Sequence, residues 1–256
     1  MTTLITGASF GIGKDLAEEF ANLGHDLILV ARSRDRLESI GKDLASRHGV
    51  RVESIVMDLA RPQAAKELHE AVERMGRTVD ILVNNAGFGD SGPFHASDAL
   101  RVTQMIELNI LTLTLLCRWF LPEMVERRSG KILNVASTAA FQAGPFMSVY
   151  YATKAYVLHY TEGLAKELEG TGVTVTALCP GPTTTEFAKT AGIHDRLLFR
   201  LPFFMDSASV AKIGVRAAMS GKTIAIAGWM NRFTAFASRF TPRKISRAVV
   251  AKLHRL

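Results

Sequence analysis

Three glycines near the N-terminus constrain the possible fold more than any other feature of the sequence. Gly7, Gly11 and Gly13 directly follow a short apolar run. That run, Thr2–Thr6, predicts a buried strand, and an amphipathic helix pattern over Ile12–Leu23 comes next. Glycine lets the backbone approach a pyrophosphate, and the free N–H groups at a helix N-terminus attract its negative charge. The G-x3-G-x-G spacing departs from the usual G-x-G-x-x-G, so the strand–turn–helix context favours a dinucleotide site over a merely tight turn.

Apolar, β-rich runs recur along the chain and alternate with helix-like segments. Most of the runs are short and continuously apolar, as strands buried on both faces should be. This alternation predicts an α/β fold of the Rossmann type, a doubly wound parallel sheet of about seven strands with helices on both faces. The predicted strands are Thr2–Thr6, Asp26–Ala31, Val50–Met57, Val79–Val83, Lys131–Val135, Val173–Leu178 and Thr223–Ala227. The predicted helices are Ile12–Leu23, Ala64–Met75 after Pro62, Asp98–Val125, which we expect to be buried on several sides, and Tyr150–Leu168.

Composition excludes several classes of protein. With 48% hydrophobic and 21% charged residues, the 256-residue chain is neither disordered nor of low complexity. We expect one dinucleotide-binding catalytic domain over 1–228, with a substrate lid over about 183–206 and a helical extension of the same domain over 229–256. The chain has only two cysteines, which is typical of a reducing compartment. It also has no apolar run of the ~18 residues that a membrane span needs and no signal-peptide pattern, so we expect a cytoplasmic protein. The seven histidines lack metal-ligand spacing, so no metal site is predicted.

The end of the second strand bears on the choice between NAD and NADP. In NAD enzymes an acid at this place binds the ribose 2′-hydroxyl, whereas here the residues are Arg32, Ser33 and Arg34. Guanidinium and hydroxyl groups suit a 2′-phosphate, which favours NADP over NAD, although a solvated basic turn is an alternative. Asp58 and Leu59 end the third strand, where the adenine edge would lie, and an Asp there is equally typical of a helix N-cap.

Three polar residues form a second constellation. Ser137 ends the fifth strand, Tyr150 lies 13 residues further on, and Lys154 follows at i+4 on the same helix face. A free tyrosine with a pKa of about 10 is a poor acid–base catalyst at neutral pH, and a nearby ammonium lowers that pKa. The pattern predicts that Tyr150 protonates a carbonyl oxygen that Ser137 also binds, as hydride arrives at carbon. A Tyr-x3-Lys pair alone is common on solvated helix faces. Tyr151 is the less favoured candidate for the acid–base, because Lys154 lies at i+3 from it.

In their order and spacing, these motifs resemble the single-domain branch of the short-chain dehydrogenase/reductase family. The resemblance covers nearly the whole body of the chain. It implies an NADP(H)-dependent oxidoreductase that interconverts a secondary alcohol with a ketone or aldehyde by hydride transfer, with Tyr150 as the acid–base. The segments that carry it are Thr6–Gly13, Asp58-Leu59, Asn84–Gly87, Asn109, Ser137, Tyr150–Lys154, and Pro180-Gly181 followed by Thr185.

The resemblance also implies a role for each motif. Asn84 to Gly87 would steady the sheet and line the adenosine ribose, and Asn109 would bind a water that continues the proton relay beyond Lys154. Lys154 would also hold the nicotinamide ribose. The catalytic set is then Asn109, Ser137, Tyr150 and Lys154. The cofactor set is Gly7, Ser9, Phe10, Gly11, Ile12, Gly13, Arg32, Ser33, Arg34, Asp58, Leu59, Asn85, Ala86, Gly87, Tyr150, Lys154, Pro180, Gly181, Thr183 and Thr185.

Departures from the family pattern bear on the substrate. Many members of the family end with a strand and a Val-Asp-Gly-Gly-like turn, whereas this chain has Thr223–Trp229 at the same place. This difference weakens the assignment as a 3-oxoacyl-type reductase, which stays an alternative. The lid expected after Thr185 is apolar, which favours a lipophilic carbonyl or alcohol, such as a fatty, steroid-like or isoprenoid compound. Local core or a subunit contact is the other interpretation. The residues concerned are Phe187, Ile193, Leu197, Leu198, Phe199, Leu201, Phe203, Phe204 and Met205, together with Phe88, Phe94, Phe141 and Phe146.

The last fifth of the chain is strongly basic. Beyond Asp206 there are ten Lys or Arg and no acid, and the pattern over 229–256 predicts two basic amphipathic helices divided by Pro242. Two interpretations of these helices stay open. They pack on the body of the protein or on a second subunit, or they make peripheral contact with an anionic membrane. Nucleic acid is not expected, since no recognition motif accompanies the charge. By resemblance, pairing through Asp98–Val125 and Tyr150–Leu168 implies a homodimer or homotetramer. A catalytically idle nucleotide-binding or membrane-surface scaffold is the alternative function.

Overall fold

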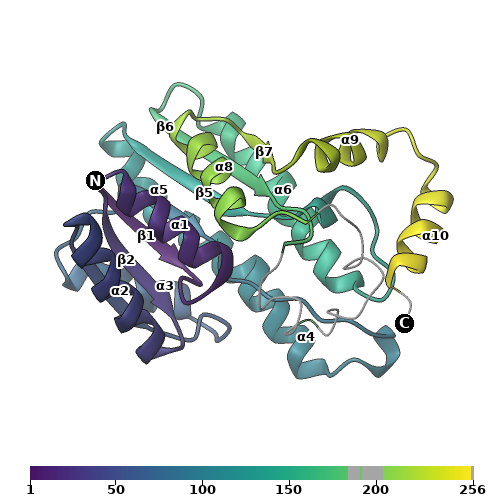
Figure 1. The fold of residues 1–256 in the computed structure, drawn as a ribbon, viewed down its shortest axis with the longest axis horizontal. Helices are drawn as coiled ribbons and strands as arrows, with labels where there is room; N and C mark the ends of the chain where they lie inside the picture. Colours follow the sequence, from purple (N-terminus) through teal and green to yellow (C-terminus); the bar gives the residue numbers. More distant parts are fainter. Residues whose placement is uncertain (184–190, 192–203, 255–256) are drawn as a thin grey trace.

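A single parallel sheet organises the chain. The computed structural model describes residues 1–183, 191 and 204–254, and within these ranges seven strands pair in the order β3-β2-β1-β4-β5-β6-β7 (Figure 1). Every pairing between them is parallel. The doubly wound α/β fold predicted from the sequence is therefore confirmed. The strands are β1 Thr2–Thr6, β2 Asp26–Ala31, β3 Val52–Val56, β4 Ile81–Asn84, β5 Gly130–Val135, β6 Val173–Cys179 and β7 Ile224–Ile226.

Helices cover both faces of the sheet. Buried side chains of α1, α2 and α8 form one core with the strands, and those of α3, α5 and α6 form a second core on the opposite face. The helices are α1 Gly11–Asn22, α2 Arg34–His48, α3 Ala64–Arg74, α4 Ala99–Ile106, α5 Leu113–Glu126, α6 Ser148–Glu167, α8 Ser207–Met219, α9 Trp229–Ala237 and α10 Arg243–His254. Short 3-10 segments, η1 Phe94–Ala96 and η3 Thr138–Phe141, and a π-helical segment, η2 Glu107–Thr112, complete the described elements.

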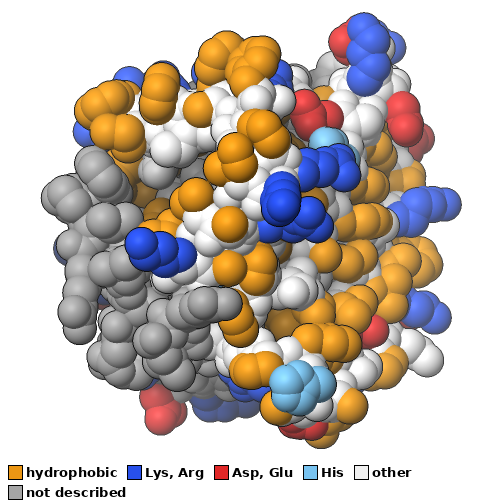
Figure 2. All heavy atoms as spheres, turned by 90° about the vertical axis from the view of Figure 1, so that its right-hand side faces the viewer, with side chains coloured by type: hydrophobic (Ala, Val, Ile, Leu, Met, Phe, Trp, Pro, Cys, Tyr) orange, Lys and Arg blue, Asp and Glu red, His pale blue; other side chains and the backbone are white. Residues whose placement is uncertain are grey.

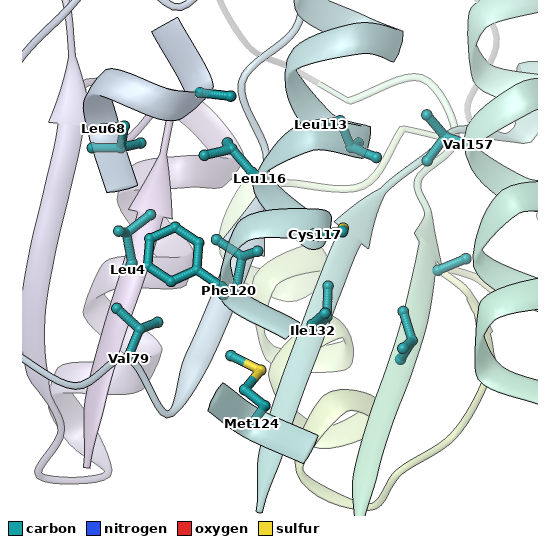
Figure 3. Packing of buried hydrophobic residues seen from close by; sticks show 14 of the residues in the cluster. Leu4, Leu68, Val79, Leu113, Leu116, Cys117, Phe120, Met124, Ile132 and Val157 are labelled. Atoms are coloured by element: carbon teal, nitrogen blue, oxygen red, sulfur yellow. The ribbon is translucent and has the colours of Figure 1, made fainter. Parts of the chain in front are cut away.

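Figure 3 shows how α5 packs on the sheet. Phe120 of this helix lies beside Leu4 of β1, and Met124 lies toward Ile132 of β5. All four side chains are almost completely buried. Because each large apolar side chain removed from water contributes about 1.5–3 kcal/mol, this stripe holds the helix firmly on the central strands.

The long apolar segment predicted as one helix over Asp98–Val125 is interrupted. Its backbone runs as α4, then the π-helical η2, then α5. Leu111 and Trp119 are exposed, so the expectation that the segment is buried on several sides is wrong. Over Ala99–Glu126 it is nevertheless the one segment among the described residues that is long and apolar enough to cross a membrane, at a mean hydropathy of 1.3. Its inner side packs on the strands as a core helix does.

The third strand also differs from its prediction. β3 ends the sheet on one side, and it is shorter than the predicted run, without Val50 and Met57. Val56 is exposed. An edge strand has a neighbour on one side only, so it does not share the burial of the central strands.

Polar contacts fasten several of these elements. In the buried interior, Asn84 Nδ2 donates to Asn134 Oδ1 at 2.9 Å, and Asn134 Nδ2 donates to Thr161 Oγ1 at 3.0 Å. These bonds join β4, β5 and α6, so an amide that ends a strand helps to set the spacing of the central sheet. Buried polar groups that satisfy one another in this way favour one arrangement of the core.

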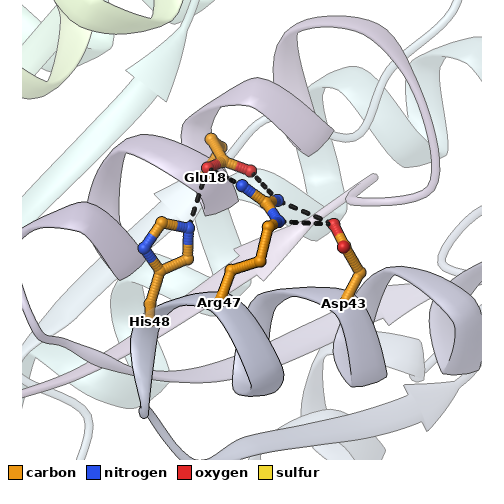
Figure 4. A network of polar contacts seen from close by, with 4 residues as sticks. All are labelled: Glu18, Asp43, Arg47 and His48. Atoms are coloured by element: carbon orange, nitrogen blue, oxygen red, sulfur yellow. Dashed lines mark hydrogen bonds and ion pairs between the residues drawn. The ribbon is translucent and has the colours of Figure 1, made fainter.

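A second polar network lies near the surface between α1 and α2 (Figure 4). Arg47 donates to Glu18 Oε1 at 2.7 Å and to Asp43 Oδ2 at 2.7 Å, and His48 Nε2 lies 2.8 Å from Glu18 Oε1. The hydrogen bond from Arg47 is the largest effect that lowers the pKa of Glu18. Partly exposed ion pairs contribute little each, so the network mainly orients α2 against α1.

Candidate active site

A cavity of about 600 Å³ lies at the carboxyl ends of the central strands. The chain leaves β1 toward β2 on one side and reaches β4 on the other, so this is the switch point at which ligands bind in open α/β sheets. The volume falls within the range of ligand pockets, which is about 300–1,000 Å³. The loops after β1, β2, β4, β5 and β6 all contribute to its wall.

The glycine turn forms the floor of one end of the cavity. Gly7 has a φ of +68°, a backbone conformation that favours glycine, and its N–H donates to Val30 O at 2.8 Å. A Cβ on Gly13 would lie 2.2 Å from Gly7 O and 2.4 Å from Asn85 Nδ2. The backbone is thus packed too closely for any side chain at this point. Phe10 precedes α1, and within the described residues no side chain caps the helix N-terminus. Its amides therefore face the cavity without a side-chain acceptor.

Asn85 ties this turn to β4. Its Nδ2 donates to Thr6 O at 2.9 Å and to Gly7 O at 3.1 Å. The Thr6 hydroxyl accepts from the N–H groups of Asn85 and Ala86, each at 3.0 Å. Two loops that are almost 80 residues apart in the sequence are in this way held as one rigid cradle.

The two arginines after β2 lie in different surroundings. Arg32 and Ser33 line the cavity, whereas Arg34 is absent from the part of the wall that the structure describes. Arg34 begins α2, and its guanidinium lies 3.7 Å from Glu38 one turn further on. Only the first of the two predicted phosphate-binding arginines is therefore placed at the cavity.

Asp58 and Leu59 line the same end of the cavity. Asp58 Oδ1 accepts from the N–H of Ala60 at 3.0 Å, so the carboxylate closes the turn after β3. It does not cap α3, whose N-cap residue is Gln63. Leu59 O accepts from the Thr112 hydroxyl at 2.8 Å, which connects this turn to the π-helical segment.

Ser137 is positioned by the end of β5 and by the loop after β6. Its Oγ accepts from Ala139 N–H at 3.1 Å at the start of η3, and it donates to Pro180 O at 3.4 Å. The second contact is long, so the hydroxyl proton is available to another acceptor in the cavity.

Tyr150 is buried on α6 and lines the cavity beside Ser137. Burial raises the pKa of Tyr150 to about 12, and a hydrogen bond with the Ser137 side chain lowers it only in part. Lys154 is not among the causes of this shift, and its Nζ, 5.9 Å from the centre of the tyrosine ring, donates a hydrogen bond to another group. The phenol therefore keeps its proton at neutral pH.

Lys154 lies one turn further along α6. Its Nζ donates to Val135 O at 2.8 Å, at the end of β5. Burial lowers the pKa of Lys154 to about 8. The ammonium is therefore held against the sheet, in a place where its charge is costly and its proton is easily lost.

Asn109 sits in the π-helical segment, where an extra residue per turn redirects the side chain. Its Nδ2 donates to Phe88 O at 2.9 Å and to Thr153 Oγ1 at 3.1 Å, and its Oδ1 accepts from Phe88 N–H at 3.1 Å. The side chain is almost fully buried and is not part of the cavity wall. It connects η2, the loop after β4 and α6.

Several wall residues were not expected from the sequence. A group of them comes from α9, its C-cap and α10, whose hydrophobic pattern gave no sign of which face would turn inward. The added wall residues include Met230, Asn231, Thr234, Ala235, Ser238, Val250, Leu253 and His254, together with Arg101, Gln104, Leu108, Gln142, Met147 and Tyr151. Thus the C-terminal extension is part of the cavity.

The apolar residues that we expected in the lid and near the substrate fall into three groups. Phe88, Phe141 and Phe204 line the cavity, whereas Phe94 and Phe146 do not. Thr183 also lines it and forms an isolated bridge with Met205. Thr185, Phe187, Ile193, Leu197, Leu198, Phe199, Leu201 and Phe203 lie outside the described residues.

One group of potential metal ligands occurs among the described residues, formed by His69, Glu73 and Glu123. The two carboxylates are exposed, and none of the three residues lines the cavity. Exposed acidic groups gather in this way without an ion, so the group adds nothing to the chemistry of the cavity.

Comparisons of sequence give one family. The model described as short chain dehydrogenase matches residues 1–195. The chain is 32% identical over 191 residues to the very-long-chain 3-oxoacyl-CoA reductase of Anas platyrhynchos, over 73% of this chain and 61% of that protein. The chain likewise spans 60% of the length of two other curated relatives.

Comparisons of structure agree. A short-chain dehydrogenase from Sphingobium yanoikuyae in complex with NADPH is 36% identical, with a TM-score of 0.84 over 93% of each chain. A bulky-bulky ketone specific alcohol dehydrogenase from Comamonas testosteroni is 30% identical, with a TM-score of 0.79 over 93% of this chain and 91% of that one. A short-chain dehydrogenase from Burkholderia phymatum in complex with NAD is 25% identical, with a TM-score of 0.84 over 96% and 95%.

Proposed function

The chain belongs to the short-chain dehydrogenase family of oxidoreductases, and from this premise we propose that it is an NADP(H)-dependent enzyme of lipophilic alcohols and carbonyls. It would interconvert a secondary alcohol with its ketone, or an alcohol with its aldehyde. One observation carries the proposal: Ser137, Tyr150 and Lys154 lie in the wall of the same cavity as the glycine cradle. A proton donor and a dinucleotide site in one cavity are what a carbonyl reduction requires.

The residues present fit a nicotinamide dinucleotide. Gly7 and Gly13 leave a cradle that a Cβ would fill, at a helix N-terminus without a described side-chain cap. Such a cradle suits a pyrophosphate. On this proposal the cofactor is held by Gly7, Ser9, Phe10, Gly11, Ile12, Gly13, Arg32, Ser33, Asp58, Leu59, Asn85, Ala86, Gly87, Tyr150, Lys154, Pro180, Gly181 and Thr183, with Thr185 assigned by resemblance alone.

The preference for NADP is proposed on Arg32. It is a cavity-lining cation with a neighbouring hydroxyl, Ser33, and no carboxylate stands at the end of β2 to repel a 2′-phosphate. The NADPH complex of the relative from Sphingobium yanoikuyae supports this choice, and the NAD complex of the one from Burkholderia phymatum leaves NAD as the alternative.

The side chains divide the work of the reaction. When bound, the nicotinamide supplies hydride to the carbonyl carbon in reduction and accepts it in oxidation. Ser137 Oγ donates a hydrogen bond to the carbonyl oxygen, and Tyr150, which is protonated at neutral pH, gives its proton to that oxygen. Lys154 holds the proton that restores Tyr150, and its pKa of about 8 makes this proton mobile near neutral pH. Asn109 acts by holding η2 and α6 together behind them.

A lipophilic substrate is proposed on the character of the wall. Phe88, Phe141, Met147 and Leu253 line the same cavity as Ser137 and Tyr150, and large apolar side chains of this kind suit a lipophilic molecule. The relative from Comamonas testosteroni acts on bulky-bulky ketones. A 3-oxoacyl-type reductase is the second candidate, because the relative from Anas platyrhynchos reduces very-long-chain 3-oxoacyl-CoA.

A carbonyl panel tests the proposal. NADPH and NADH are compared with short polar ketones, bulky ketones, steroid-like ketones and 3-oxoacyl thioesters, and the loss of reduced nicotinamide is followed. Tyr150→Phe should still bind NADPH but turn over at least ~100-fold more slowly, whereas the exposed control Tyr156→Phe should keep its activity. Wild-type turnover by Tyr150→Phe would overturn the assignment. Tight NADPH binding without turnover on any carbonyl would instead favour a catalytically idle scaffold.

The assembly is proposed to be a homodimer or homotetramer in the cytoplasm. The outer faces of α5 and α6 leave Trp119 and Tyr156 exposed, and Tyr156 stacks on Tyr160 with ring centres 5.7 Å apart. Exposed aromatic side chains of this kind are enriched in interfaces. Sedimentation velocity of the wild type and of Trp119→Ser measures the assembly directly.

A further inference from the structure

The outer faces of α9 and α10 form an unusual surface, which we call the C-terminal surface. Along α9, large apolar side chains recur at i, i+4, i+7 and i+11, so they form one stripe. That stripe points away from the body: Trp229 is 75% exposed and Phe240, just beyond the helix, is 74% exposed. The exposed apolar members of the surface are Trp229, Phe233, Phe236, Phe240, Ile245 and Val249.

Basic side chains are interspersed with this stripe. All of them are exposed, and no ion pair joins any of them to an acid within the part of the chain that the structure describes. The sequence has no acid at all after Asp206, so none is near along the chain. Figure 2 shows Lys and Arg side chains among hydrophobic ones at the centre of this side of the molecule. The basic members are Arg232, Arg239, Arg243, Lys244, Arg247 and Lys252.

The inner faces of the same helices belong to the cavity. Ala235 of α9 and Val250 and His254 of α10 are buried and line its wall. The two helices therefore separate the cavity from the C-terminal surface, and Figure 1 shows them beyond the end of the sheet. A hydrophobic molecule bound at the surface would lie one helix thickness from the proposed substrate site.

We propose that the C-terminal surface docks on an anionic lipid bilayer. Exposed aromatic side chains can insert among the lipid acyl chains, while the interspersed Lys and Arg side chains contact the anionic headgroups. A second copy of this chain is a poorer occupant, because a two-fold axis would bring six basic residues of each copy against those of the other. Docking does not depend on the proposed enzymatic function, since it is measured without turnover.

Vesicle co-sedimentation tests the proposal on the full chain. Phosphatidylcholine vesicles with and without 30% phosphatidylglycerol are compared at low and high salt. The triple variant Arg232→Glu, Arg239→Glu, Arg243→Glu should partition to anionic vesicles at least ~100-fold more weakly, because each basic residue near such a surface contributes strongly. The matched control, Lys42→Glu, Lys66→Glu, Lys166→Glu, changes net charge equally on other exposed helices and should bind like the wild type.

Tryptophan fluorescence gives an independent measurement. The chain has two tryptophans, so in a Trp119→Phe background Trp229 alone reports. Its emission should shift to shorter wavelength with anionic vesicles and not with neutral ones. Phe233→Ser with Phe236→Ser should weaken binding, whereas Leu23→Ser, at the exposed position that directly follows α1, should not.

Any of four results would overturn the proposal. The first is equal binding to neutral and anionic vesicles, the second is an equal loss of binding in the triple variant and its control, and the third is an unshifted Trp229 spectrum. The fourth is a fall in molecular mass on Phe233→Ser with Phe236→Ser, since that result assigns the surface to a second copy of the chain. Carbonyl turnover by every variant in detergent would leave the proposed enzyme intact whichever result is obtained.

Discussion

The Tyr151 hydroxyl and His254 Nε2 form a buried hydrogen bond of 2.8 Å between residues 103 positions apart. Their rings also meet edge to face, with centres 5.6 Å apart. Tyr151 is the immediate neighbour of Tyr150 on α6, and His254 ends α10. The C-terminal helix is thus fastened to the helix that carries the proposed acid–base.

Tyr151→Phe should loosen α10. The change keeps the ring and removes the hydroxyl, which leaves His254 Nε2 buried without this bond, at a cost of about 1–3 kcal/mol. Cleavage by trypsin within α10, at Arg247 or Lys252, should accelerate about tenfold, since local opening becomes easier. Tyr156→Phe, on the exposed side of the same helix, is the control. Equal cleavage rates for wild type and Tyr151→Phe would contradict this role.

Lys154→Met should stabilise the protein without its cofactor at neutral pH. Burial lowers the pKa of Lys154 in the folded state from its ordinary 10.5 to about 8, so the folded state holds a costly charge below pH 8. The difference corresponds to about 3 kcal/mol.

The direction of the pH effect follows from proton binding. Between pH 8 and 10.5 the unfolded chain binds more protons at this residue, so wild-type stability should rise with pH there. That rise should be absent in Lys154→Met. Urea unfolding from pH 7 to 9.5, below the range in which tyrosines ionise, measures the pH dependence of stability in the wild type and in the variant. A less stable Lys154→Met at pH 7 would show that the ammonium is better accommodated than its burial indicates.

Gly13→Ala should damage the dinucleotide cradle. Its Cβ would meet Gly7 O at 2.2 Å, which is backbone and cannot move freely. We expect at least tenfold weaker NADPH binding and a loss of about 1–3 kcal/mol of stability. Gly163→Ala on α6 is the matched control, because nothing lies within 4 Å of its Cβ and alanine favours a helix. It should bind NADPH normally and be slightly more stable, and fluorescence titration of NADPH distinguishes the two variants.

Arg32→Asp should shift coenzyme preference toward NADH, whereas Arg34→Asp should leave it nearly unchanged. Only Arg32 lines the cavity, and Arg34 lies beside Glu38. Losing a charge-assisted contact to a 2′-phosphate and adding repulsion should change the ratio of kcat/KM values by about 10–100-fold. An equal change of coenzyme preference in the two variants would contradict this role of Arg32, because it would mean that both arginines act only through the overall charge of the site.

The fold could be predicted because its signals are local. A buried parallel strand is recognisable from its own residues, and both ends of all seven predicted runs lie within two residues of the ends of the observed strands. Tyr150 and Lys154 share a helix face because four residues make about one turn. The place of β3 at the exposed edge of the sheet and the π-helical break at Asn109 were not predictable, since each depends on what lies beside the segment.

The sequence by itself determined the glycine turn, the order of strands and helices, and the spacing of the tyrosine and the lysine, because backbone conformation and periodicity are properties of neighbouring residues. Only the tertiary structure decided that Lys154 bonds to Val135 O instead of lowering the pKa of Tyr150. It also separated Arg32 from Arg34 and brought His254 to Tyr151. Those relationships join distant segments, and they arise from burial and from the packing of helices on the sheet, which no local pattern records.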